Sequence, residues 1–166
     1  MASLTHRLIR FLQRLAPAHG PAHLQLGRRG ETEAYFYLKR LGYRIVAMNF
    51  RAPHHRGEID LIGWDKGALC FIEVKTRMDD SFAPPSTAVT IKKQRNIVAV
   101  AKRYLRRLPG DRPPCRFDIV SVVPSAKGDE PQFTLHKGAF DWNAGSSRRR
   151  EYRDYSDKRY WRGRPR

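Results

Sequence analysis

The sequence predicts an α/β fold in which helices flank a central mixed β-sheet, with the elements in the order αβββαβ. Apolar stripes at helical spacing over 27–41 and 90–108 indicate two long helices. Apolar runs rich in branched and aromatic residues indicate strands over 43–50, twice within 57–77, and over 116–123. A hairpin within 57–77 and a helical crossover before the last strand make the predicted sheet mixed.

The predicted hairpin depends on one turn. Asp65–Gly67 supplies the signal for it, because glycine adopts positive φ without strain. A two-residue turn centred on Lys66 and Gly67 pairs positions whose numbers sum to 133, so that Trp64 faces Leu69. A three-residue loop with a bulge at Gly67 is the alternative, and it would shift every pair.

With the two-residue turn, Asp60 faces Glu73 and Glu58 faces Lys75, and all four side chains project from one sheet face. Two opposed carboxylates repel unless a cation or a proton lies between them. An Asp followed on the next strand by Glu-x-Lys is typical of a metal-dependent phosphodiesterase, since carboxylates suit Mg²⁺ and a lysine can orient or activate the attacking water. A surface ion-pair ladder is the alternative, and it fits Asp60 opposite Glu73 badly.

These motifs resemble the blocks of the YraN-type family, a widespread bacterial family of the PD-(D/E)xK nuclease superfamily that is similar to Holliday-junction resolvases. The resemblance runs from about Gly27 to Val123, through 30–31, 49–51, 57–62, 71–77, 88–89 and 116–120. It implies a restriction-endonuclease-like core and nuclease chemistry, with Asp60 and Glu73 as metal ligands beside the Val74 carbonyl. It also implies a homodimer, because the resolvase relatives act as dimers.

Glu31 is the third carboxylate assigned to the site. On the helix over 27–41 it falls in line with the apolar stripe, whereas Glu33 falls on the opposite side with Arg40. In relatives of the superfamily a glutamate of the first helix reaches the metal site, so the resemblance implies the same for Glu31. The alternative is a carboxylate stabilised by the helix dipole. The predicted catalytic set is therefore Glu31, Asp60, Glu73 and Lys75.

Charge points to a polyanionic partner. The 166 residues contain 33 Lys and Arg against 16 Asp and Glu, a net charge of +17, which favours nucleic acid, DNA before RNA. No apolar run is long enough for a membrane span. Cys70 and Cys115 are far apart in the sequence and are interpreted as buried thiols of a cytoplasmic protein, not as a disulfide or a zinc site.

The helix over 90–108 has seven basic residues and no acidic one. Like charges on one helix repel unless an anion lies nearby, so this helix is predicted to contact the phosphate backbone, chiefly near its start. The alternative is plain solubilisation. The predicted nucleic-acid-binding residues are Arg56, Arg77, Lys92, Lys93 and Gln94.

Three segments are predicted: a basic amphipathic extension and linker over 1–26, the nuclease-like domain over 27–145, and a tail over 146–166. The tail has nine basic and three acidic residues interleaved with aromatics, a composition typical of a disordered arm that grips single-stranded nucleic acid. The segment 78–87 is predicted to be a flap, and Asp118 to form a structural ion pair with Arg116.

These observations favour a Mg²⁺-dependent endonuclease that hydrolyses phosphodiester bonds in DNA, branched or single-stranded, with Mn²⁺ as a substitute metal. One alternative is a non-catalytic nucleic-acid-binding protein on the same fold. Another is an RNA- or ribosome-associated factor, suggested by the arginine and aromatic residues of the tail. The intact acidic set favours the enzyme, because a pure binder gains nothing from carboxylates that face phosphate.

Overall fold

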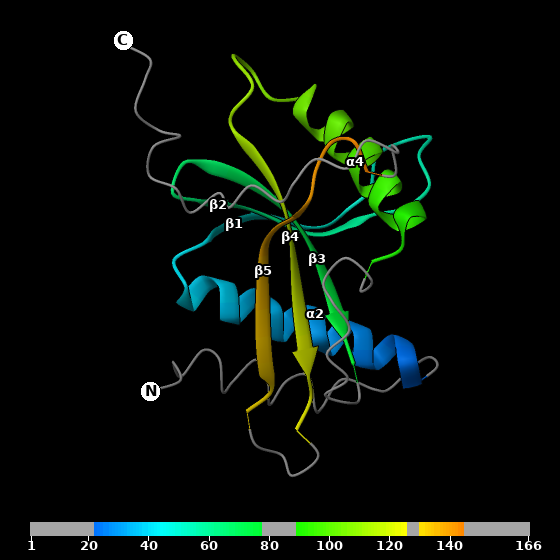
Figure 1. Ribbon diagram of the computed structural model, residues 1–166, viewed down its shortest axis with the longest axis vertical. Coiled ribbons are helices and arrows are strands. Elements are labelled where there is room, and N and C mark those ends of the chain that lie inside the picture. Colours follow the sequence, from blue (N-terminus) through cyan, green and yellow to red (C-terminus); the bar gives the residue numbers. More distant parts are fainter. Residues whose placement is uncertain (1–21, 78–88, 126–129, 145–166) are drawn as a thin grey trace.

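Five strands form one mixed sheet in the order β1-β2-β3-β4-β5, with a helix on each face (Figure 1). The computed structural model describes residues 22–77, 89–125 and 130–144. The elements are α2 (Ala22–Arg40), β1 (Arg44–Phe50), β2 (Ile59–Asp65), β3 (Ala68–Thr76), α4 (Ile91–Leu105), β4 (Cys115–Val123) and β5 (Gln132–Phe140). The predicted α/β fold is confirmed, and the arrangement is consistent with a restriction-endonuclease-like core.

The first helix begins earlier than predicted. α2 starts at Ala22 instead of Gly27, so part of the stretch interpreted as a linker is helical. Its end agrees with the prediction, because Gly42 adopts a φ of 89° and the next amide, that of Tyr43, donates to the Leu38 carbonyl at 3.0 Å. Glycine at this position ends a helix at little cost in strain.

The hairpin between β2 and β3 has the predicted register. Trp64 pairs with Leu69 and Leu61 with Ile72, which are the pairs expected from a two-residue turn. Lys66 and Gly67 have φ values of 48° and 85°, as required at the two central positions of a type I′ turn. The alternative with a bulge at Gly67 is therefore wrong.

β3 and β4 are parallel neighbours, joined through α4 as predicted. Thr90 caps this helix, and its Oγ1 accepts a hydrogen bond from the Lys93 amide at 3.3 Å. β5 then pairs antiparallel with β4. The sequence over 133–136 also predicts a short last edge strand, and β5 (Gln132–Phe140) is longer than that.

Two apolar clusters lie on opposite faces of the sheet. On one face, Ile97 and Val100 of α4 pack with Phe71 and Phe117 of the central strands. On the other face, Leu38 of α2 packs in a cluster that includes Ile72 and Val120. Because side chains alternate along a strand, the register decides which residues of β2 and β3 face α4.

A buried ion network joins β4 to residues of β2 and β5. Nε of Arg116 lies 2.7 Å from Oδ1 of Asp118, which confirms the predicted structural ion pair. The same guanidinium lies 2.7 Å from Oδ2 of Asp65, and Lys137 lies 2.8 Å from that oxygen. Asp118 also accepts hydrogen bonds from the Tyr43 hydroxyl and the Gly138 amide. Its carboxylate is therefore saturated with donors.

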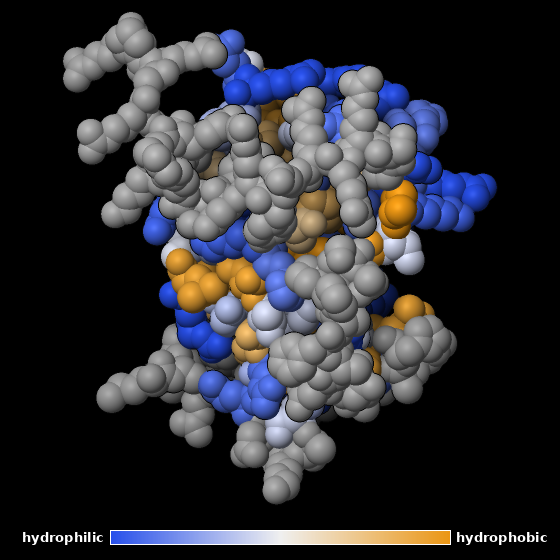
Figure 2. All heavy atoms as spheres, in the orientation of Figure 1, coloured by the Kyte–Doolittle hydropathy of each residue, from blue (hydrophilic) through white to orange (hydrophobic). Residues whose placement is uncertain are grey.

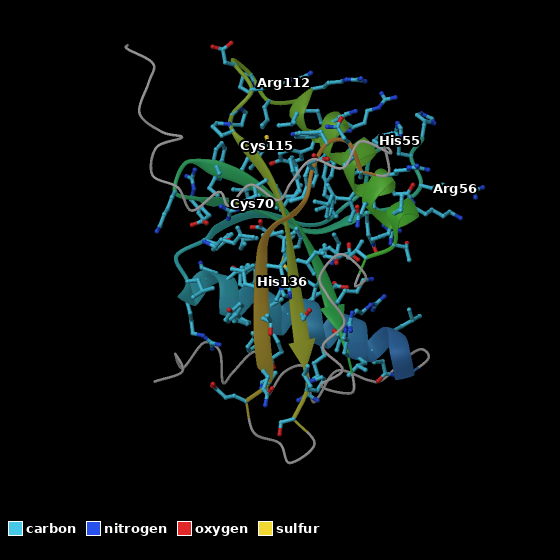
Figure 3. The ribbon with its side chains drawn as sticks, viewed as in Figure 1. His55, Arg56, Cys70, Arg112, Cys115 and His136 are labelled. Atoms are coloured by element: carbon cyan, nitrogen blue, oxygen red, sulfur yellow. The ribbon has the colours of Figure 1, made fainter. Side chains whose placement is uncertain are left out.

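Both cysteines are free thiols on neighbouring strands (Figure 3). Cys70 is fully buried, and burial raises the pKa of its thiol. Cys115 is half-buried, not buried as expected, and burial raises its pKa to about 11. Neither thiol is activated as a nucleophile.

Some predictions lie outside the described residues: most of the basic amphipathic extension over 1–26, the flap over 78–87 and the tail over 146–166. In the part of the chain that the structure describes, neither helix is long and apolar enough to cross a membrane.

Candidate active site

Asp60 and Glu73 lie on the face of the sheet that α4 covers. Continuing the β2–β3 register from Leu61 and Ile72 places these two carboxylates opposite each other. Both are buried, with 5% of Asp60 and 2% of Glu73 exposed. The Val74 amide donates a hydrogen bond to Oδ2 of Asp60 at 2.7 Å, so the Asp60 side chain is held against β3.

The two carboxylates are electrostatically coupled. Burial, followed by the negative charge of Glu73, raises the pKa of Asp60 from 3.8 to about 7, and the Val74 hydrogen bond only partly offsets this. Desolvation and a like charge both disfavour the ionised form. Without a metal ion, Asp60 therefore holds a proton more tightly than an ordinary carboxyl group does.

Two lysine ammonium groups flank Glu73. Nζ of Lys75 lies 3.1 Å from Oε1, and Nζ of Lys93 lies 3.1 Å from Oε2. Within the described residues the Lys93 ammonium is the contact of the buried Oε2, which has no other hydrogen-bond partner. Burial alone would lower the pKa of Lys93, but the charges of Glu73 and Asp60 raise it.

This donor set fits a divalent cation. In the described part of the chain, the two opposed, buried carboxylates rely on the ammonium groups of Lys75 and Lys93 for charge balance. Mg²⁺ is commonly held by one or two carboxylates together with substrate phosphate and water. In the described ranges no group of three or more His, Cys, Asp or Glu side chains is placed to hold a metal ion.

Glu31 reaches the same site from α2, although its helix covers the other face. Gly30 makes this approach possible, because a Cβ there would collide with Oγ1 of Thr76 at the end of β3. Burial raises the pKa of Glu31; a hydrogen bond from Asn49 opposes this, and the charges of Glu58 and Glu73 add to it. Glu31 is thus close enough to interact with both Asp60 and Glu73.

The predicted orientation of α2 needs a correction. Glu33, which was expected on the exposed side, is only 3% exposed, whereas Glu31 is half-buried. The buried face runs through Gly30, Glu33, Ala34 and Leu38. Ala34 and Leu38 belong to the predicted stripe, but the buried face extends to Glu33 instead of Glu31.

The predicted pair of Glu58 and Lys75 is also replaced. Glu58 precedes β2 and forms an ion pair with Arg51, whose Nη2 lies 2.7 Å from Oε2. Lys75 turns to Glu73 instead. Regular strand β2 begins only at Ile59, after Glu58. The β2–β3 register therefore does not determine which residue Glu58 contacts.

The predicted nucleic-acid-binding residues do not share one surface. Arg56 is exposed on the loop beside α4, next to His55 (Figure 3), and Lys92 is exposed on α4 itself. Lys93 faces Glu73, and Gln94 is buried with its side-chain amide donating to the Val89 carbonyl at 2.9 Å. Arg77 follows β3 and lies near His136, whose pKa is lowered first by burial and then by the charge of Arg77.

Hydrophilic side chains gather at the upper right of the space-filling view, where α4 lies in Figure 1 (Figure 2). Six basic residues of this region are exposed: Lys92, Arg95, Lys102, Arg103, Arg106 and Arg107. Arg56 lies on the adjoining loop, because Gly57 packs against Asn96 of α4. Lys92 of this surface adjoins Lys93, whose ammonium contacts Glu73, so the cationic surface borders the buried carboxylates at the start of α4.

Sequence reasoning missed two contributions to the site. Lys93 was assigned to a surface, although it stands four residues before the buried Ile97, and side chains four residues apart share a helix face. Asn49 was not considered, yet it adopts a φ of 51° and bonds Glu31. Asparagine tolerates this conformation better than most residues, which could have drawn attention to it.

Comparison with known proteins decides the family. The model of "Uncharacterised protein family UPF0102" matches residues 30–122, more than half of the chain. The chain belongs to the UPF0102 family. This confirms the resemblance to the YraN-type family. The matched range contains Glu31, Asp60, Glu73, Lys75 and Lys93.

Similar UPF0102 proteins come from several bacteria. The protein of Koribacter versatilis is 45% identical over 141 residues, which cover 84% of this chain and 96% of that relative. The protein of Symbiobacterium thermophilum is 47% identical over 104 residues, covering 63% and 86%. That of Chlorobium phaeobacteroides is 47% identical over 98 residues, covering 59% and 76%.

Proposed function

We propose that this protein is a Mg²⁺-dependent nuclease that hydrolyses phosphodiester bonds in DNA. The observation that carries the proposal is the pair of buried carboxylates Asp60 and Glu73, coupled to each other and bordered by a cationic surface. A surface that binds phosphate gains nothing from buried, mutually repelling carboxylates beside it. A divalent cation makes the combination favourable, because it attracts both the carboxylates and the phosphate.

In this proposal Asp60 and Glu73 hold the metal, together with the Val74 carbonyl, and Mn²⁺ can substitute for Mg²⁺. The metal supplies Lewis acidity and a more acidic bound water. Lys75 orients the attacking water and offsets charge that develops on the phosphorus oxygens. The Lys75 side chain is 36% exposed, and its ammonium contacts Oε1 of Glu73. Lys75 is therefore held at the edge of the site, open to solvent.

Glu31 and Lys93 adjust the charge of the carboxylate site. The raised pKa of Glu31 is consistent with its contributing a further carboxylate to the site. Lys93 places a positive charge on the metal-binding glutamate. In the metal-free protein we expect this ammonium to offset part of the charge that the metal later balances.

The test combines cleavage with metal-linked stability. The wild type is incubated with branched, single-stranded and duplex DNA in Mg²⁺ and in Mn²⁺, beside Asp60→Ala, Glu73→Ala and Lys75→Ala. Asp111→Ala is the matched control, since Asp111 is an exposed acid outside the site. We expect cleavage by the wild type and the control only, and a metal-dependent rise in melting temperature that Asp60→Ala and Glu73→Ala abolish.

A binding protein without catalysis gives a different result. It retains affinity for DNA but shows no metal-dependent cleavage and no metal-dependent melting shift, with or without DNA. That result would replace the nuclease proposal by that of a non-catalytic nucleic-acid-binding protein. Cleavage that survives Asp60→Ala and Glu73→Ala would place the reaction elsewhere.

A further inference from the structure

A pocket of about 270 Å³ lies between α4 and the segment that follows β5. Its lining residues are Arg95, Val98, Ala99, Lys102, Trp142 and Ala144. Small-molecule sites typically measure about 300–1,000 Å³, so this pocket suits one flat group and not an extended cofactor. None of its lining residues belongs to the carboxylate site.

Trp142 is the aromatic wall of the pocket, and the core holds it in place. Its ring meets Phe117 edge to face at 4.7 Å between centroids and an interplanar angle of 77°, and Phe71 at 6.3 Å and the same angle. The indole is nevertheless half-buried, not buried. An aromatic side chain fixed from behind and open in front is a stacking platform for a planar ligand.

The charge of the pocket selects an anion. Arg95 and Lys102 are both exposed, and seven residues along a helix place them about 10 Å apart along the axis. Nε of Arg95 also donates to the Ala144 carbonyl at 3.4 Å, which ties the segment after β5 to the helix. The neighbouring acid Asp141 accepts the Asn143 amide at 2.7 Å and does not line the pocket.

The chain's own tail is a poor occupant. Residues 146–166 contain nine basic and three acidic residues, so two further cations repel them. An apolar, aromatic wall between two cations instead complements a planar base that carries a phosphate.

We propose that this pocket binds one unpaired nucleotide of a nucleic-acid strand, with its base on Trp142 and its phosphate between Arg95 and Lys102. The inference deepens the proposed function and rests on it, because it assigns that nuclease a substrate with a single-stranded portion. Lys93 at the carboxylates and Arg95 at the pocket are two residues apart on the same helix. These two side chains point to different sides of α4, so a strand that occupies the pocket reaches the carboxylates around the helix.

The test measures binding of the full chain to a labelled single-stranded oligonucleotide and to a blunt duplex, in EDTA so that no cleavage occurs. Arg95→Gln with Lys102→Gln removes two pocket cations, and Arg103→Gln with Arg106→Gln removes two exposed cations of the same helix outside the pocket. We expect the pocket pair to lose about tenfold more single-strand affinity than the control pair. Both pairs should weaken duplex binding by the same factor.

Trp142→Leu isolates stacking from charge. We expect it to weaken single-strand binding about fivefold or more, in keeping with the worth of one stacked base, with an unchanged dependence on salt. Ala99→Leu serves as a second variant that fills the pocket without removing a core contact. Circular dichroism and melting curves confirm that each variant is folded.

Two results would overturn the proposal. One is wild-type single-strand affinity in both Trp142→Leu and Ala99→Leu. The other is an equal loss by the pocket and control pairs on both substrates, which would leave only a general basic surface. Because binding is measured without metal, either result leaves the nuclease proposal untouched. Conversely, if the wild type shows no metal-dependent cleavage but the pocket variants lose single-strand affinity, the nuclease proposal fails and the nucleotide pocket remains.

Discussion

Replacing Asp60 by Asn should stabilise the metal-free protein at pH 8. Asp60 is 5% exposed, and burial with the charge of Glu73 raises its pKa from 3.8 to about 7. Below about pH 4 both the native and the unfolded states hold the proton, so the carboxyl group costs nothing. As the pH rises toward 7, the unfolded state ionises while the native state resists, and the free energy of unfolding falls.

The size of the effect follows from the shift. A difference of about three pKa units, at 1.36 kcal/mol per unit, sets a ceiling of about 4 kcal/mol. We therefore expect a gain of about 2–4 kcal/mol for Asp60→Asn at pH 8. The amide oxygen of asparagine can still accept the Val74 hydrogen bond, so the variant loses charge and little else.

The assay is urea unfolding followed by circular dichroism in EDTA, at pH 5 and pH 8. Asp65→Asn is the matched control, since Asp65 is a buried carboxylate on the same strand. Burial alone would raise the pKa of Asp65, but hydrogen bonds from Lys137 and Arg116 lower it. Its contribution to stability is therefore present above the unfolded pKa and lost as the pH falls, and Asp65→Asn should destabilise at pH 8. Destabilisation by Asp60→Asn at pH 8 would refute the electrostatic account of the site.

Two further predictions concern the basic side chains. In EDTA, Lys93→Met should lower the free energy of unfolding by about 1–2 kcal/mol, because buried Glu73 loses one of two ammonium neighbours, while the exposed Lys92→Met should change it by less than about 0.5 kcal/mol. Equal effects in urea unfolding would contradict the placement of Lys93. Arg116→Met should cost about 3–5 kcal/mol, since it leaves two buried carboxylates without their shared partner; a loss below about 1 kcal/mol would show that Lys137 and Tyr43 suffice.

The sequence predicted the hairpin well because its information is local. Lys66-Gly67 favours a two-residue turn, and that turn sets the pairing of every residue in the ladder. The prediction that Asp60 and Glu73 share a face follows from the same register. Where regular pairing stops, at Glu58, the prediction failed, because an irregular segment gives Glu58 a different partner.

The helices were harder to predict because their faces depend on tertiary contacts. Gly30 approaches Thr76 of a distant strand, and this close packing, not the apolar pattern of α2, fixes which glutamate is buried. Lys93 was likewise assigned to the exposed face by its charge, although the spacing to Ile97 places it inward. A charged residue on an apolar stripe is informative only when the buried partner, here Glu73, is known.

The sheet carries two buried acidic pairs whose surroundings differ, and the difference separates a structural role from a functional one. Asp65 and Asp118 accept hydrogen bonds from Arg116, and Lys137, Tyr43 and the Gly138 amide supply further donors. Asp60 accepts from the Val74 amide, while within the described residues Oε2 of Glu73 has no hydrogen-bond partner other than the Lys93 ammonium. Buried polar groups are normally satisfied. The pair on β2 and β3 consists of two mutually repelling carboxylates that rely on Lys75 and Lys93, so this pair, and not the saturated pair on β2 and β4, is where the proposed metal would bind.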